Sequence, residues 1–321
     1  MDVLQHLGID LGAVPEDFKG AVAGRTLIMD GDGPAYRVAA KCKRLDTAIR
    51  QYHTVMLTEM FMTEAQFLTV HLTANTSQKN GRGNIIATQP YQGNRKNKSK
   101  PPLLEPLRTA LTLPENWLPE MNVILHHELE ADDGMMIQSY QLKEDGVIWS
   151  DDKDLRLTPY PYYEQSLGVV TGSVEVGSLW KAYTPAGAMK ILGRADKFFW
   201  CQMLMGDTAD NVKGIDRLYG KLCGKAAAYN LLKDCKSVSE AANLVFDAYR
   251  FSDQNVLAEG WMLHLLRFEG DNFWHYAMEC GLSPENQAFL TACAKRHWRL
   301  RPNERRDYDK GKWTSDIYVV A

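Results

Sequence analysis

Acidic side chains recur in this 321-residue chain just beyond short apolar segments. If those segments are neighbouring strands of a parallel sheet, the carboxylates that follow them meet in a crevice outside the carboxyl ends of the strands. Carboxylates gathered in this way raise one another's pKa, so the arrangement is costly unless cations accompany it. The residues concerned are Asp30, Asp32, Glu130, Asp132, Asp133, Asp151, Asp152, Asp154, Asp207 and Asp210.

Ligands that offer only carboxylate oxygens select hard divalent ions such as Mg²⁺ or Mn²⁺. Two such ions about 4 Å apart can activate a water molecule and stabilise the leaving oxygen when a phosphodiester bond is cut. A single Asp at a strand end is more often a helix N-cap or a turn former. The recurrence of acidic residues after successive strands argues against that interpretation for the whole set. We therefore expect a two-metal site for phosphodiester hydrolysis.

The elements that must position these residues can be identified from hydrophobic runs. Short apolar runs alternate with helical patterns, and helices are expected to begin near Ala35 and Glu130. Such alternation favours an α/β fold with a central, mostly parallel sheet and helices on both faces. The predicted strands are 25–30, 67–73, 121–126, 147–150 and 168–171.

A change of pattern divides the chain into two predicted domains. From about Tyr183 onward the pattern turns helical, with amphipathic runs at 197–206, 225–235, 238–250 and 255–268. We therefore expect an α/β core at 1–195 that carries the predicted two-metal site. A helical region that ends in a basic segment is expected at 196–321.

Composition excludes several other classes of protein. Hydrophobic residues make up 45% of the chain and charged residues 24%, which is typical of a soluble globular protein. No segment approaches the ~20 consecutive apolar residues of a membrane span, and the first residues do not suggest a secretory signal. The six cysteines form no Cys-x-x-Cys pair, which argues against a zinc ribbon or a disulfide framework. We expect a protein of the reducing cytoplasm, the host's if the gene belongs to a phage.

The net charge of −3 conceals local asymmetry. Residues 79–108 contain seven Lys/Arg and one Glu, and residues 295–306 contain six Lys/Arg and one Glu. Between them, residues 126–154 contain nine Asp/Glu and two Lys. A polyanion held together with cations would suit such a distribution. Because the first basic stretch is also rich in Asn, Gly and Pro, we expect it to be a loop that orders on DNA.

Four motifs resemble those of the 5′-nuclease or flap-endonuclease family. They are MDGD at 29–32, EADD at 130–133, SDDKD at 150–154 and GDTADNVKGI at 206–215. Bacteriophage 5′–3′ exonucleases and the 5′-nuclease domain of bacterial DNA polymerase I are the most similar branches. The resemblance extends from about residue 25 to residue 232 and implies a PIN-like core. Four motifs in the correct order make a chance match improbable.

The resemblance divides the carboxylates into two clusters, each of which would hold one Mg²⁺ or Mn²⁺ ion. Asp32 and Asp151 stand beside motif positions and are either supporting or incidental. The first cluster is Asp30, Glu130, Asp132 and Asp133, and the second is Asp152, Asp154, Asp207 and Asp210.

The resemblance also implies several contacts with DNA. An arginine at position 37 would contact a substrate phosphate, and the arch or loop at 79–108 would carry a Tyr-Lys-x-x-Arg segment at its base. A helix–hairpin–helix region at about 207–232 would grip the duplex backbone through glycine amides, with a K⁺ ion. The DNA-binding residues implied are Arg37, Tyr91, Arg95, Gly214, Gly224 and Lys225.

The sequence departs from the family pattern at three places. The Asp expected after the second strand is absent, and Asn75 or Ser77 occupies that neighbourhood. The Lys of Tyr-Lys-x-x-Arg is Gln92, so restoring a lysine there is expected to raise the cleavage rate. The hairpin region at 214–228 is longer than the compact Gly-Ile-Gly-x-Lys form, although Gly224 and Lys225 keep its ending.

These observations together predict a metal-dependent 5′–3′ exonuclease or flap endonuclease. Its substrate would be duplex DNA with a 5′ end or a 5′ flap, and we expect a monomer. A PIN-type ribonuclease is the first alternative, although the helix–hairpin–helix segment favours duplex DNA. A non-catalytic binder of branched DNA is the second, suggested by Gln92 and by the missing Asp. The intact acidic clusters argue against this second alternative. A protein that only binds DNA would gain nothing from closely placed negative charges beside a polyanion.

Overall fold

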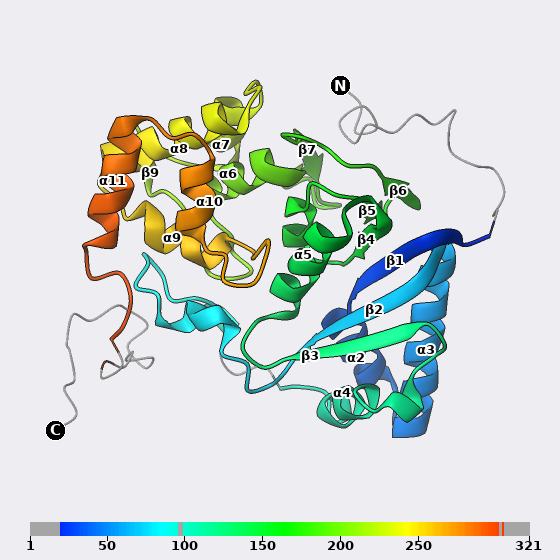
Figure 1. Ribbon diagram of the computed structural model, residues 1–321. Coiled ribbons are helices and arrows are strands. Elements are labelled where there is room, and N and C mark those ends of the chain that lie inside the picture. The colour runs from blue at the N-terminus through cyan, green and yellow to red at the C-terminus, as the bar shows by residue number, and fades with distance from the viewer. Residues whose placement is uncertain (1–19, 96–98, 302–303, 305–321) are drawn as a thin grey trace. The chain divides into compact units, whose positions relative to one another are not determined.

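The computed structural model describes residues 20–95, 99–301 and 304, with only the backbone at Arg95 (Figure 1). These residues form two compact units. The first unit comprises the described residues within Met1–Asn80, Lys98–Glu175 and Leu265–Glu269. The second comprises those within Gly81–Asn97, Val176–His264 and Gly270–Ala321.

The first unit is built on a sheet whose described strands run in the order β3-β2-β1-β4-β5-β6. All neighbouring strands are parallel except β5 and β6, which are antiparallel. The mostly parallel α/β sheet predicted from the sequence is therefore confirmed. Strand β5 was not predicted, because its three residues follow Pro161 and end in Glu164 and so lack the apolar run that marked β6. The bounds are β1 Val22–Asp30, β2 Ala65–Thr73, β3 Met121–His126, β4 Gly146–Trp149, β5 Tyr162–Glu164 and β6 Val169–Thr171.

Helices cover both faces of this sheet (Figure 1). Alternate residues of β1 point to opposite faces, so Leu27 and Met29 join one core while Ile28 joins another. The larger core includes side chains from α2, α3 and α4, and the smaller one lies against α5. These helices are α2 Asp32–Lys41, α3 Leu45–Met62, α4 Leu104–Leu111 and α5 Ala131–Leu142. Short 3₁₀ turns of this unit are η4 Pro114–Asn116, η5 Lys143–Asp145 and η6 Lys153–Leu157.

The strand order places a switch point at β1. Strand β1 pairs with β2 on one side and with β4 on the other, so the succession of strands reverses there. In open α/β sheets, ligands bind outside the carboxyl ends of the strands at such a point. The residues that follow β1 and β4 therefore lie where a ligand site is expected.

The second unit is mainly helical and contains two small hairpins. Its core is aromatic, with Trp200, Phe246 and Phe273 fully buried. The hairpins are β7 Leu179–Tyr183 with β8 Met189–Gly193, and β9 Arg217–Leu218 with β10 Lys221–Leu222. The helices are α6 Ala195–Met205, α7 Lys225–Leu232, α8 Val238–Ser252, α9 Val256–Leu263, α10 Phe273–Glu279 and α11 Pro284–Ala294.

Two details of this unit differ from the sequence expectation. Helical structure does not begin at Tyr183, because the β7–β8 hairpin turns through Thr184 and Gly187 and helix α6 starts at Ala195. The described part of 79–95 is not simply a loop, since Ile85 is buried and the buried Arg82 donates to the carbonyl of His264. Two 3₁₀ turns, η2 Lys79–Asn84 and η3 Gly93–Arg95, also lie there. None of the described helices is long and apolar enough to cross a bilayer.

Candidate metal centre

Asp30 is the last residue of β1 and lies at the switch point. Its carboxylate is buried. It accepts a hydrogen bond from the backbone amide of Asp32 at 3.0 Å and another from the hydroxyl of Ser150 at 2.8 Å. Burial, and then the negative charges of Asp32 and Asp152, raise the pKa of Asp30 to about 6. A buried carboxylate beside further carboxylates is an environment that a bound cation would stabilise.

Ser150 connects Asp30 with the acidic turn that follows β4. Its Oγ also accepts the backbone amide of Asp152 at 2.9 Å. In turn, Oδ1 of Asp152 accepts the backbone amide of Asp154 at 2.9 Å and so caps η6. The side chain of Asp154 is 13% exposed and pairs with Lys153 at 2.7 Å. Residues from the ends of two adjacent strands are therefore joined by direct hydrogen bonds.

The N-terminus of α5 carries the remaining acids of the first cluster. Glu130 is the N-cap residue and exchanges side-chain-to-backbone hydrogen bonds with Asp133 in a capping box. Asp133 is fully buried, and its Oδ1 also accepts the amide of Leu266 at 3.3 Å. Asp132 is partly buried. Asp133 therefore has a structural role beside the metal-binding role that the sequence suggests.

Lys79 places a basic side chain at this site. Its Nζ lies 3.1 Å from Oε1 of the buried Glu130. The local chain is fixed because Ser77 Oγ accepts the amide of Lys79 and donates to the carbonyl of Leu129. The pairing places a positive charge beside the first carboxylate cluster.

Thr73, at the end of β2, links the acidic segment after β1 to the acidic segment at the start of α5. It lies near the position where the 5′-nuclease family usually has an Asp. Its amide donates to Asp32 Oδ2 at 3.1 Å, and its Oγ1 accepts the amide of Ala131 at 2.9 Å. Arg108 also pairs with Asp32, at 2.6 Å. Asn75 lies near the position where the missing Asp was expected, and its side-chain oxygen accepts a hydrogen bond from the ammonium group of Lys100. Asp32 is thus engaged by α4 and β2.

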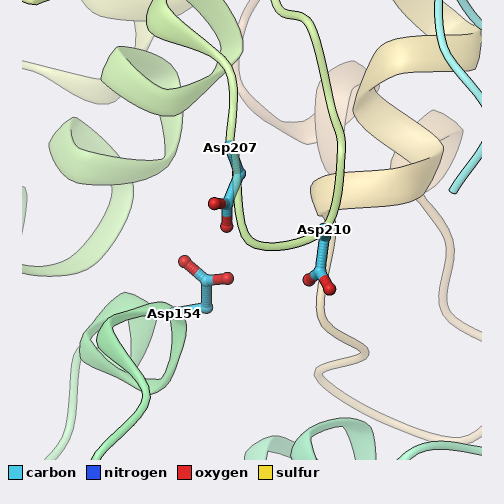
Figure 2. A group of neighbouring side chains, drawn as sticks. All are labelled: Asp154, Asp207 and Asp210. Carbon is cyan, nitrogen blue, oxygen red and sulfur yellow. The ribbon is translucent and has the colours of Figure 1, made fainter. Parts of the chain in front are cut away.

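The motif residues Asp207 and Asp210 lie on a tight loop of the second unit, after α6 (Figure 2). The loop is closed by reciprocal backbone hydrogen bonds between Asp207 and Val212, at 2.8 and 2.7 Å. Gly206 and Gly214 both have φ of +71° and pack against each other, so that a Cβ on Gly214 would lie 2.4 Å from the amide nitrogen of Gly206. The two glycines therefore make this close turn possible.

The closed loop brings two carboxylates together. Asp207 is buried and its Oδ1 accepts the amide of Ala209, while Asp210 is partly buried. Oxygen atoms of the two side chains lie within 4.8 Å of each other. Figure 2 also labels Asp154, which belongs to turn η6 of the first unit. A donor set made only of carboxylate oxygens fits a hard divalent ion.

Residues 90–94 hold this loop from one side. The side-chain amide of Gln92 donates to Asp210 Oδ1 at 3.0 Å, and its backbone amide donates to the Asp210 carbonyl at 2.8 Å. Asn94 donates to the carbonyl of Thr208, and Asn211 donates to the carbonyl of Pro90. The segment that resembles the base of the family's arch is therefore bonded to the acidic loop within the same unit.

The proposed DNA-binding residues differ in exposure. Arg37 is exposed on α2, pairs with Asp151, and lines a cavity of about 390 Å³ with Lys41 between α2 and α3. Gly224 is exposed as the N-cap of α7, and Lys225 is the exposed first residue of that helix. In contrast, Tyr91 and Gly214 are buried, and the side chain of Arg95 lies outside the described residues.

Some of these contacts could not have been found from the motifs. Ser150 had a local signal, because a small hydroxyl residue ends the strand immediately before the acidic turn. Lys79 and Arg108 had none, since their partners Glu130 and Asp32 are 51 and 76 residues away in the chain. Long-range ion pairs of this kind depend on the tertiary fold.

The mostly parallel sheet, with its strand order and the helices on both faces, matches the α/β PIN-like fold of the 5′-nucleases. A search of solved structures supports this, and the resemblance seen in the motifs is confirmed at the level of the fold. The D15 protein of bacteriophage T5, co-crystallised with metal ions, matches with a TM-score of 0.50 at 14% identity. The match covers 84% of this chain and 98% of that chain.

Two other phage T5 structures align over the same shares of both chains. A point mutant of the 5′-exonuclease has a TM-score of 0.44 at 13% identity. A flap endonuclease variant in a pseudo-enzyme–product complex with DNA and metal ions has a TM-score of 0.48 at 14% identity. No protein-family model matches the chain. No curated protein sequence matches it either.

Proposed function

We propose that this protein is a metal-dependent 5′–3′ exonuclease or flap endonuclease that hydrolyses DNA near a 5′ end. The observation that carries the proposal is the environment of Asp30. This carboxylate is buried at the switch point, bonded through Ser150 to the Asp152 turn, with its pKa raised to about 6. Perturbed carboxylates gathered at a ligand-binding edge are typical of a catalytic site rather than of a structural turn.

The donor chemistry fits two Mg²⁺ or Mn²⁺ ions. Bound there, the ions would lower the pKa of the attacking water and stabilise the leaving oxygen. The chain's own contribution is to fix the ligands, as the capping box fixes Glu130 and the Ser150 hydroxyl fixes Asp30. The proposed ligands are Asp30, Glu130, Asp132 and Asp133 for one ion, and Asp152, Asp154, Asp207 and Asp210 for the other.

Basic residues outside the acidic clusters would hold the DNA. Arg37 and Lys41 lie beside one cavity and could bind backbone phosphate, releasing counterions from the DNA. The first residues of α7 are exposed, and this helix N-terminus with Lys225 suits a duplex phosphate, because helix N-termini bind anions. Such contacts carry no sequence information, which suits an enzyme that recognises the form of a DNA end. A K⁺ ion at this helix–hairpin–helix region is part of the same proposal.

A cleavage assay tests the proposal. A duplex labelled at its 5′ end, the same duplex with a 5′ flap, and a matched RNA duplex are incubated with Mg²⁺, with and without a chelator. We expect Mg²⁺-dependent release of short labelled products from DNA and no cleavage when the chelator is present. Preferential cleavage of the RNA would favour a PIN-type ribonuclease. Binding of DNA without any cleavage would favour a non-catalytic binder.

A further inference from the structure

The β9–β10 hairpin is an exposed, preformed tip on the second unit. Its two-residue strands pair Lys221 with Leu218 and Leu222 with Arg217. The turn residues Tyr219 and Gly220 both have positive φ, of 48° and 82°. Such a turn matches the twist of the flanking strands and holds the tip in one conformation. A rigid projection of this kind can insert into a partner without a large loss of conformational entropy.

Large apolar side chains on and beside this hairpin are exposed to solvent. Leu222 is 78% exposed, Tyr219 48%, and Phe251, at the end of α8, 65%. The rings of Tyr219 and Phe251 contact each other edge to face, with centroids 5.6 Å apart. A cluster of exposed apolar residues on a soluble protein indicates an interaction surface.

Positive charge surrounds the apolar tip. Arg217 and Lys221 are exposed on the hairpin itself, and Lys213 and Lys225 are exposed on the segments that enter and leave it. Two acids lie near the tip: Asp216, 3.7 Å from Lys213, and Asp247, which pairs with Arg250 at 3.0 Å. Burial, and then the negative charge of Asp247, raise the pKa of Tyr219. Five cations against two carboxylates favour a polyanionic partner over a neutral protein surface.

We propose that the hairpin binds duplex DNA by its phosphates and places Leu222 and Tyr219 against the base pairs in the minor groove. Apolar side chains inserted in this way partly unstack one base step and bend the duplex. Arg217 and Lys221 lie on the same two strands, so they can reach the phosphates on either side of the inserted side chains. The inference rests on the proposed function and explains why this hairpin is longer than the compact form of the family.

The test measures binding and base unstacking separately, in a chelator so that the DNA stays intact. Duplexes carry 2-aminopurine at successive positions, and affinity is measured by fluorescence anisotropy. We expect the unaltered protein to raise 2-aminopurine fluorescence at one or two steps. Leu222→Ala combined with Tyr219→Ala should abolish that rise and weaken binding about tenfold.

Two control variants separate insertion from other effects. Lys225→Gln should weaken binding and lower the salt dependence, yet keep the fluorescence rise at saturation. Leu57→Ala removes a similarly exposed leucine from α3 of the first unit and should change neither measurement. Equal thermal midpoints confirm that the variants fold.

The outcomes distinguish this inference from the proposed function. If the unaltered protein binds the duplex but the double variant keeps both its affinity and its fluorescence rise, the hairpin inference is overturned. The tip would then be a surface for a protein partner. If the unaltered protein binds no DNA at all, the proposed function fails together with the inference.

Discussion

The side-chain amide of Gln92 donates a hydrogen bond to Oδ1 of Asp210, 3.0 Å away. The backbone amide of Gln92 donates to the carbonyl of the same aspartate at 2.8 Å. Two bonds from one residue fix both the backbone and the carboxylate of Asp210. Because the Gln92 side chain is neutral, the bond orients the carboxylate without cancelling its charge.

Gln92→Lys should lower metal affinity and the cleavage rate, which reverses the expectation drawn from the sequence alone. An ammonium group in place of the amide would pair with Asp210 and neutralise a charge that the proposed ion needs. We expect Mn²⁺ binding, measured by calorimetry, to weaken about tenfold, the effect of roughly 1.4 kcal/mol.

Asn122→Lys, at an exposed position on β3 of the first unit, is the matched control because it adds the same charge to a residue that forms no part of the loop. It should leave Mn²⁺ affinity unchanged. A faster cleavage rate for Gln92→Lys with unchanged metal binding would contradict the prediction. It would show that Gln92 lacks a positive charge that cleavage needs and does not serve to orient Asp210.

Gly214→Ala should disrupt the acidic loop. The new Cβ would lie 2.4 Å from the backbone nitrogen of Gly206, and φ at this position is +71°. Gly187→Ala is the control, because its φ is +79° but no atom lies within 4 Å of the added Cβ. We expect Gly187→Ala to cost about 1 kcal/mol of unfolding free energy and Gly214→Ala about 2 kcal/mol or more. Equal losses in urea unfolding would mean that the contact between the two glycines has no energetic importance.

Asp30 should make the metal-free protein less stable as pH rises. Its pKa is about 6 in the folded state against 3.8 for an ordinary Asp, chiefly because it is buried. The folded state holds the proton of Asp30 more tightly than the unfolded state does. The protonated Asp30 therefore makes its full contribution to folding stability below pH 4, and this contribution is lost as pH rises to about 6. Asp30→Asn carries no charge at any pH, and should therefore be more stable than the native chain at pH 7, by up to about 3 kcal/mol.

Urea unfolding in a chelator at pH 4 and pH 7 measures this difference. The advantage of Asp30→Asn should shrink towards zero at pH 4. If the stability gained by Asp30→Asn does not change with pH, the gain comes from packing and not from the ionisation of Asp30.

The sequence predicted five of the six strands of the first unit's sheet, and the acids at their ends, because both depend on local patterns. The apolar run before Asp30 and the run before Asp151 mark buried strands, and parallel strands bring their carboxyl ends to one edge. The loop with Asp207 and Asp210 was recognisable as a motif, since its glycines stand at fixed positions.

Contacts between distant segments were beyond such patterns. Gln92 reads in the sequence as a lost charge, and only the fold shows that it lies beside Asp210. The same holds for Arg108, whose pairing with Asp32 depends on the packing of α4 against α2 within the first unit. The basic composition of 79–108 suggested a loop, but composition could not show that Ile85 and Tyr91 are buried.

Removing two charges from the turn after β4 tests the central claim most directly. Asp152→Asn with Asp154→Asn keeps the shape of the turn, because an asparagine oxygen can still accept the amide of residue 154. The matched control is Glu144→Gln with Asp145→Asn, which removes two exposed charges at the opposite end of β4.

The measurement is cleavage of a 5′-labelled duplex in Mg²⁺, with DNA affinity measured on the same samples. We predict that the turn variant loses cleavage by at least about 1,000-fold, because the chemistry depends on the ions that these carboxylates hold. Its DNA affinity should be unchanged or higher, since two negative charges near the backbone are gone. The control should cut normally. Normal cleavage by the turn variant would contradict the assignment of the active site to these strand ends.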